Sequence, residues 1–145
     1  MGATESEHKA VVRRFIGQVF NAGDLAVIDE LVARDYVLHA APEVRGPEGM
    51  QHFVTMYRTA FPDYACTVDD QIAEGDKVVT RWTARGTQQG ELMGIPPTGK
   101  QVTLPGVVID RIAANGQLVE TWLQADVLGM LQQLGVVQAP AGAAA

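Results

Sequence analysis

The hydrophobic pattern of this 145-residue chain changes its period once, close to Pro62. Before that point, apolar residues recur at spacings of three and four, which is typical of amphipathic helices. After it, apolar and polar residues mostly alternate, as in half-buried strands, until a short helical segment closes the chain. Helices followed by neighbouring strands predict an α+β fold with an antiparallel sheet, and they exclude the alternating order of a parallel Rossmann sheet.

Three helices are predicted before the change of period. The first covers roughly residues 5–21, and its apolar stripe consists of Val12, Phe15, Ile16, Val19 and Phe20. The second is the short segment 24–32, and a brief extended piece follows it at 35–41. The third opens with Gly46-Pro47, because proline is tolerated in the first turn of a helix, and it stops at the next proline.

Two pairs of antiparallel strands are predicted after the change of period. The first pair spans residues 67–87 and turns at 74–76, while the second spans 102–126 and turns at Asn115-Gly116. Asn-Gly is the strongest short hairpin signal. A curved sheet with helices on one face makes a cone, and this cone holds a ligand cavity wherever the helices do not fill it.

Composition and charge limit the expected partners. The net charge is −6 and the chain has no cluster of Lys and Arg, so neither nucleic acid nor an anionic membrane surface is an expected partner. The start of the chain lacks a signal-peptide pattern and no apolar run could span a bilayer, which predicts a cytoplasmic protein. Without a repeat or linker, residues 1–138 are expected to form one domain, and the Ala-rich residues 139–145 a disordered tail.

The segment GIPPTGKQ at 94–101 superficially fits the phosphate-binding loop G-x-x-x-x-G-K-[ST]. Its two prolines remove N–H donors, Gln101 replaces the hydroxyl residue, and a strand-like segment follows where a helix is needed. A plain loop is therefore predicted. The three histidines lack the spacing of metal ligands and Cys66 is the only cysteine, so no metal site and no covalent nucleophile is expected.

The remaining candidates for chemistry lie on or beside the strands. On a regular strand Glu120, Trp122, Gln124 and Asp126 share one face, which mixes carboxylate, amide and indole and so suits a pocket better than a dry core. The alternative is a solvent face, and this is the interpretation for Glu120. Asp126 is either the N-cap of the closing helix or an acid/base catalyst that faces a cavity. His39 is expected beside the opening of the cone, as a site residue or as a satisfied hydrogen-bonding group.

Several segments carry a resemblance to a known family. They are FPDY at 61–64, AEGDKVVTRWTARGT at 73–87, GELMGIPPTGKQV at 90–102 and NGQLVETWLQAD at 115–126, with MLQQLG closing the chain. In these segments the chain resembles the SnoaL-like polyketide cyclases, or ester cyclases, of the nuclear transport factor 2-like superfamily. The resemblance implies helices packed on a strongly curved, mainly antiparallel sheet that encloses a pocket. It also implies a dimer and no metal or organic cofactor.

The resemblance further implies roles for individual residues. In the family's cyclases, an Asp at the end of a W-x-x-x-D strand is the acid/base of an intramolecular aldol ring closure, and this Asp matches Asp126. His39 and Asp110 match polar pocket residues by position rather than by motif. Three further substrate contacts are expected apart from the resemblance: Trp122 and Gln124, from the strand face that they share with Asp126, and Arg81. The expected substrate is a hydrophobic polyketide-like or aromatic carbonyl compound.

Other functions of the same fold stay open at this point, because a fold does not fix a reaction. They are binding of a small molecule without turnover, and an isomerase, dehydratase or hydroxylase-like activity. Relatives that hydrolyse epoxides use Arg-x-Asp where this chain has Arg81-Trp82-Thr83. Thr83 stands in the position of the Asp, so epoxide hydrolysis is not favoured. Gln88 replaces a histidine that the family often has before the long loop.

A homodimer is expected from the one-sided cover of the sheet. If helices cover one face, the other face needs a partner, and it is predicted to be apolar through Val78, Trp82 and Val107. The expected contact is sheet to sheet between two copies of the chain.

Overall fold

The computed structural model describes residues 2–138 and contains four α-helices, one π-helical segment and six strands. The helical elements are α1 (Gly2–Arg14), η1 (Phe15–Asn21, π-helical), α2 (Ala26–Leu31), α3 (Gly46–Ala60) and α4 (Val127–Leu134). The strands are β1 (Val32–His39), β2 (Val44–Arg45), β3 (Ala65–Glu74), β4 (Lys77–Thr87), β5 (Gln101–Ile112) and β6 (Leu118–Ala125). None of the helices within residues 2–138 is long and apolar enough to cross a membrane. The tail predicted at 139–145 lies outside the described residues.

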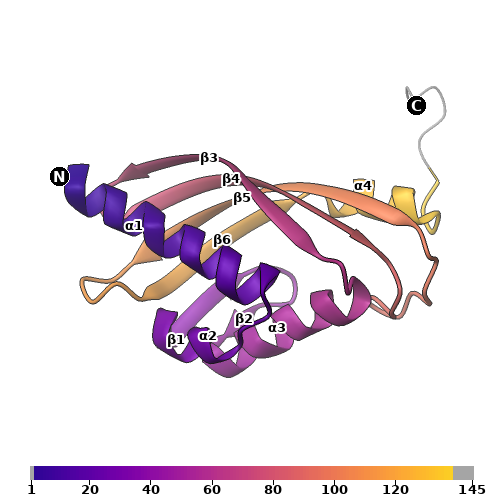
Figure 1. Cartoon of the computed structure of the whole chain (residues 1–145), viewed down its shortest axis with the longest axis horizontal. Coiled ribbons are helices and arrows are strands. Elements are labelled where there is room, and N and C mark those ends of the chain that lie inside the picture. Colours follow the sequence, from indigo (N-terminus) through magenta and orange to yellow (C-terminus); the bar gives the residue numbers. More distant parts are fainter. Residues whose placement is uncertain (1, 139–145) are drawn as a thin grey trace.

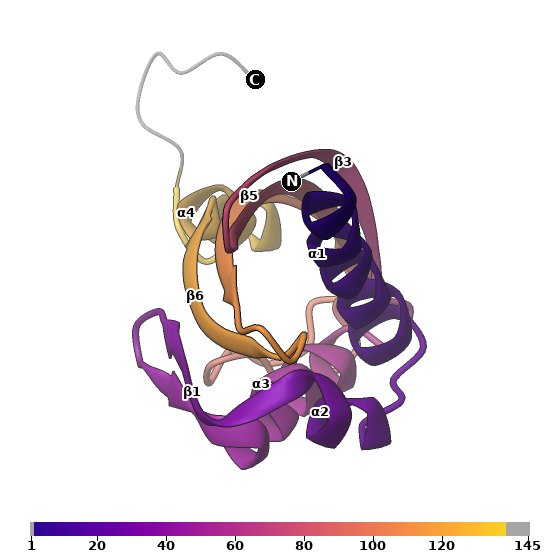
Figure 2. The same cartoon turned by 90° about the vertical axis from the view of Figure 1, so that its left-hand side faces the viewer.

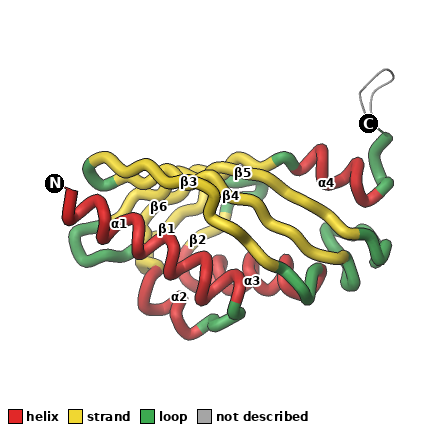
Figure 3. The backbone as a smooth tube through the Cα atoms, turned by 45° about the horizontal axis from the view of Figure 1, so that its top comes forward, coloured by secondary structure: helices red, strands yellow, loops and turns green. Residues whose placement is uncertain are grey.

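The six strands form one mixed sheet in the order β2-β1-β6-β5-β4-β3. Strands β1 and β6 run parallel, and the other neighbours run antiparallel. The first three helices lie on one side of the sheet and α4 lies at its far end (Figure 1 and Figure 3). Seen from the other direction, the strands curl around an interior that α1 borders on one side (Figure 2). The predicted α+β cone is therefore confirmed.

The predicted elements are found, with differences in the first helix and in the strands β1 and β2, of which β2 was not predicted. Both hairpins turn where expected, at Gly75 and Gly116, and both glycines have the positive φ that favours glycine. The first helix begins earlier than predicted and becomes π-helical from Phe15, and Phe15, Ile16 and Val19 of the predicted apolar stripe are buried. The extended piece predicted at 35–41 is the longer strand β1, and its parallel pairing with β6 was not predicted.

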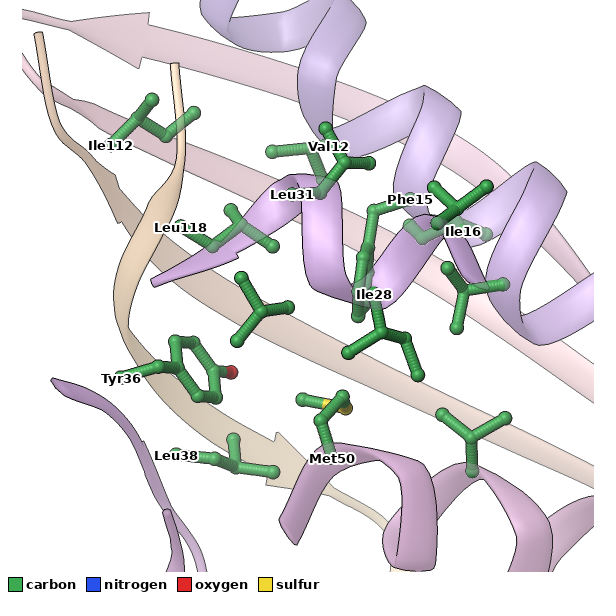
Figure 4. Close-up of a cluster of buried hydrophobic side chains, with 14 of the residues drawn as sticks. Val12, Phe15, Ile16, Ile28, Leu31, Tyr36, Leu38, Met50, Ile112 and Leu118 are labelled. Carbon is green, nitrogen blue, oxygen red and sulfur yellow. The ribbon is translucent and has the colours of Figure 1, made fainter. Parts of the chain in front are cut away.

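The core has two parts that meet on the inner face of the sheet. The first joins α1, η1, α2, α3 and β1 and is shown in Figure 4; its larger members include Phe15, Ile28, Leu31, Tyr36, Met50 and Leu118. The second lies toward α4 and includes Phe61, Trp82, Leu92, Leu104, Met130 and Leu134. The helices thus fill much of the cone and leave a small space at the end near α4.

The predicted dimer face is wrong in two of its three residues. Val78 and Trp82 are buried on the inner face of β4, whereas Val107 is exposed on the outer face of β5. The reason is the strand register. Val107 pairs with Arg81, the neighbour of Trp82, and successive side chains on a strand point to opposite faces.

Candidate functional site

A chain of three buried polar side chains crosses the inner face of the sheet on the neighbouring strands β1, β6 and β5. The Tyr36 hydroxyl donates a hydrogen bond to Thr121 Oγ1 at 2.7 Å, and the Thr121 hydroxyl donates to Asp110 Oδ1 at 2.5 Å. Their exposed fractions are 2% for Tyr36, 4% for Thr121 and 5% for Asp110. Figure 4 shows the Tyr36 ring among the apolar side chains of the first core part. These three side chains therefore form a hydrogen-bonded polar cluster inside an apolar interior.

Burial sets the protonation state of this cluster. It raises the pKa of Asp110 to about 7, although the hydrogen bond from Thr121 acts in the opposite direction. Burial also raises the pKa of Tyr36, and the nearby Asp110 carboxylate adds to this increase. Near neutral pH, Asp110 therefore exists in both its protonated and its ionised form, while Tyr36 keeps its proton. A carboxyl group in this state can both accept and donate a proton.

A second polar pair lies on the inner face at β3 and β4. Gln71 Nε2 donates to Thr80 Oγ1 at 3.2 Å and to the Lys9 carbonyl oxygen of α1 at 3.3 Å. Thr80 is fully buried, and Gln71 Oε1 is buried without a hydrogen-bond partner among residues 2–138. An unsatisfied buried acceptor is uncommon in folded proteins. Together with Asp110, Thr121 and Tyr36, this pair gives each of five neighbouring strands one polar group on the inner face.

A small apolar pocket that is open to solvent lies at the end of the cone near α4. Its lining residues are Tyr57, Phe61, Tyr64, Ala84, Arg85, Gly86, Val102, Leu104 and Met130. The next inward position of the sheet holds Trp82, whose indole lies directly over Gly106. A Cβ at Gly106 would be 2.3 Å from this ring, so the position requires glycine. Asp110 lies further inward, opposite Val78.

The loop that follows β4 is organised by Gln88, which is fully buried. Its Nε2 donates to the carbonyl oxygens of Gly90 and Ile95, and its Oε1 accepts from the backbone N–H and the hydroxyl of Thr98. Leu92 of this loop belongs to the second core part. The loop leads into β5 and not into a helix, which agrees with the predicted plain loop. Gln88, where the resemblance implied a histidine, thus has a structural role here.

His39 lies at the outer side of the sheet. Its Nε2 is 2.7 Å from Glu120 Oε2, and its ring stacks on Trp122 with ring centres 5.4 Å apart. Glu120 also accepts a hydrogen bond from Arg111, and its pKa is lowered first by the bond to His39 and further by the contacts with Arg111. These contacts do not include Asp110, so His39 takes part in a separate surface cluster.

The structure contradicts the predicted inward orientation of the Trp122 face. Directly paired residues on neighbouring strands lie on the same face of the sheet, and Asp110, which points inward, pairs with Thr121. Thr121 and Leu123 therefore face the interior, while Trp122 and Gln124 are exposed. The mixture of side chains on this face had predicted that it lines a pocket. Neither Trp122 nor Gln124 lines the interior pocket.

Two further predicted site residues are also at the surface. Arg81 is exposed, and its Nη1 is 3.7 Å from Asp69 Oδ2. Asp126 is exposed and is the N-cap of α4, where its Oδ1 accepts a hydrogen bond of 2.9 Å from the Gly129 N–H. The N-cap interpretation of Asp126 is confirmed, and its catalytic role stays a prediction. Of the predicted site residues, only Asp110 is buried in the interior.

Sequence patterns did not single out Thr121, Tyr36 or Gln71. One signal was available for Asp110, because it interrupts the alternating apolar positions of β5 between Val108 and Ile112. Within the part of the chain that the structure describes, no three His, Cys, Asp or Glu side chains gather as a metal site would need.

Comparison with known proteins agrees with this architecture. Residues 10–134 match the family described as SnoaL-like polyketide cyclase. The aklanonic acid methyl ester cyclase DnrD of Streptomyces peucetius is 29% identical over 130 residues, which cover 86% of this chain and 88% of that protein. The aklanonic acid methyl ester cyclase DauD of Streptomyces sp. (strain C5) is also 29% identical over 130 residues, which cover 86% of this chain and 80% of that protein. The structure of TsrD from Streptomyces laurentii superimposes with a TM-score of 0.83 at 30% identity, covering 91% of this chain and 97% of that one.

Proposed function

Because the chain belongs to the SnoaL-like polyketide cyclase family, we propose that it closes a ring in a hydrophobic, polyketide-like carbonyl compound by acid/base catalysis. The observation that supports this most is the carboxyl group of Asp110. It is the only buried carboxyl among the residues that the structure describes, and burial brings its pKa to about 7. A group with a pKa near the working pH is the most effective general acid or base.

The proposed reaction is an intramolecular aldol addition. Asp110 in its ionised form takes a proton from the carbon beside one carbonyl group. That carbon then forms a bond to the carbon of a second carbonyl group, and the oxygen of the second group receives the proton back from Asp110. The proton count balances, and no oxidant or reductant is consumed. General acid/base help of this kind is worth about 10²–10⁴-fold in rate.

The apolar lining of the pocket suits a flat, polycyclic carbonyl compound better than a sugar or a phosphate. The enclosed space of this pocket is far smaller than the ~300–1,000 Å³ of pockets that enclose such ligands. Along β4 and β5, Trp82 and Gly106 lie between this pocket and Asp110, so the proposal requires side chains on this path, Trp82 among them, to move when a ligand binds. Aklanonic acid methyl ester, the compound in the names of two relatives, is the first substrate to test.

The test is incubation with aklanonic acid methyl ester in D₂O, followed by liquid chromatography, mass spectrometry and NMR. We expect a ring-closed product with the connectivity of an isomer, and deuterium at the carbon that loses its proton. A matched incubation without protein measures spontaneous closure. If the ester binds but neither closes nor exchanges deuterium, and related polyketide esters behave in the same way, the chain is a binding protein instead.

The homodimer is also a proposal, with a different surface from the one first predicted. The outer face carries a row of paired apolar residues that crosses four strands: Ile72, Val79, Ile109 and Trp122. Ile72 is 64% exposed, Trp122 is 37% exposed, and Val107 beside the row is 39% exposed. Burial of this row between two copies would remove it from water, which favours association.

Sedimentation at micromolar concentration is expected to give twice the chain mass of 15.6 kDa. Val107→Lys should shift the protein toward the monomer, because it brings a charge into the contact. Gln101→Lys, at an exposed position on the same strand, is the matched control and should stay dimeric. A wild-type monomer under these conditions would refute the dimer.

A further inference from the structure

The direction of the hydrogen bonds in the buried cluster follows from the count of its protons. Tyr36 and Thr121 have one hydroxyl hydrogen each, and a buried hydroxyl needs an acceptor. Within the described residues, Thr121 Oγ1 is the acceptor that the Tyr36 hydroxyl reaches. Thr121 therefore has to accept from Tyr36, and its own hydrogen has to go to Asp110 Oδ1. The opposite direction would leave the Tyr36 hydrogen without an acceptor.

This direction makes the two oxygens of Asp110 unequal. Oδ1 accepts the Thr121 hydrogen at 2.5 Å, a length typical of a hydroxyl bond to a carboxylate oxygen. Oδ2 has no hydrogen-bond partner among residues 2–138. When Asp110 takes up a proton, this proton therefore belongs on Oδ2, since Oδ1 is already occupied by a donor.

Apart from Thr121, few groups near Asp110 could change the ionisation of its carboxyl group. Its opposite neighbour on β4 is the buried Val78, and Tyr36 is the titratable group that faces it from β1. Burial and the Thr121 hydrogen bond are the two causes that act on its ionisation. Arg111, the next residue on β5, binds Glu120 on the outer side of the sheet. Among residues 2–138, Thr121 is thus the one polar contact through which the protein can adjust this carboxyl group.

We propose that Thr121, held in place by Tyr36, is a positioning residue that keeps Asp110 Oδ1 as a fixed acceptor and directs proton exchange with the substrate to Oδ2. The proposal rests on the proposed function in so far as a substrate exchanges the proton. Its structural part, the control of Asp110 by Thr121, holds without turnover. The two parts can therefore be tested separately.

The test is a ¹³C NMR titration of the Asp110 carboxyl carbon, assigned with Asp110→Asn, in the wild type and in three variants. Thr121→Val has the same shape without the hydroxyl, and it should raise the pKa of Asp110 by about one pH unit or more, because a donor to the ionised form is lost. Thr121→Ser keeps the hydroxyl and should titrate like the wild type. Tyr36→Phe should raise the pKa by a smaller amount, because Thr121 stays but is no longer held.

Turnover supplies the second measurement. The limb of the pH–rate profile that reports the ionisation of Asp110 should move to higher pH in Thr121→Val, and kcat should fall more than KM rises. Thr121→Ser should restore both. If Thr121→Val does not fold, the Tyr36→Phe titration decides in its place. If the pKa of Asp110 is unchanged in the folded hydroxyl-deletion variant, Thr121 does not control Asp110 and this proposal is wrong. If the pKa shifts but no ring closure is found, the control by Thr121 stands and the proposed function is rejected.

Discussion

Asp110→Asn is expected to lower the rate of ring closure by about 10²–10⁴-fold, which is the usual contribution of a general acid/base group. Asparagine has nearly the same shape as aspartate, and its carbonyl oxygen can still accept the hydrogen bond from Thr121. It cannot exchange a proton near neutral pH. The variant should therefore fold and bind the substrate, and it should lose kcat and kcat/KM to a similar degree. Single-turnover measurements with the ester give the comparison.

The matched control is Asp126→Asn, and it makes the same chemical change at the surface. Asp126 caps α4 through the Gly129 N–H, and asparagine caps a helix about as well as aspartate. This variant should turn over within a few-fold of the wild type. Asp126→Ala should instead lose about 0.5–2 kcal/mol of stability, because it removes the cap.

The pair of variants separates two hypotheses about the acid/base residue. The family resemblance implies Asp126, whereas the buried position supports Asp110. If Asp126→Asn loses two or more decades of turnover and Asp110→Asn keeps the wild-type rate, the role returns to Asp126. In that case α4 or a partner subunit would have to bring the exposed carboxylate to the substrate.

The order of the elements could be predicted because its signals are local. Alternation, the glycines of the two turns and the proline that opens α3 are each read within a few residues, and all three agree with the structure. The parallel contact between β1 and β6 has no such signal, since it joins residues about 85 positions apart, as Tyr36 and Thr121 are.

The orientation of β6 was predicted wrongly for a related reason. A shift of one residue exchanges the two faces of a strand, and the correct choice depends on pairing with β5, whose register shifts between Arg111 and Ile112. The indole of Trp122 suggested a pocket, but Leu123 is the side chain that packs in the core. The polar chain from Tyr36 to Asp110 could not be seen in advance, because each of its residues is ordinary in its own segment.

The last prediction concerns the pH dependence of stability, where burial of Asp110 should cost the folded state free energy. Its pKa is about 7 in the fold and about 3.9 in an unfolded chain, so between these values the folded state binds more protons than the unfolded state. The free energy of unfolding should therefore fall as the pH rises from about 4 through about 7, and change little from this source above that. A difference of about three units between the folded and the unfolded pKa corresponds to a change of at most about 4 kcal/mol in the free energy of unfolding.

Other carboxyl groups act in the opposite direction, so the contribution of Asp110 has to be isolated. The pKa values of Asp63 and Glu120 are lowered in the fold, which adds stability above the pKa of the unfolded chain. Urea unfolding of wild type and Asp110→Asn between pH 4 and pH 8 cancels these contributions. The variant should gain up to about 4 kcal/mol relative to wild type between the two ends of this range. Asp126→Asn controls for the change in net charge. If the difference in unfolding free energy between wild type and Asp110→Asn stays constant with pH, Asp110 has the same pKa in the folded and the unfolded protein. That result would remove the physical basis for its role as the acid/base group.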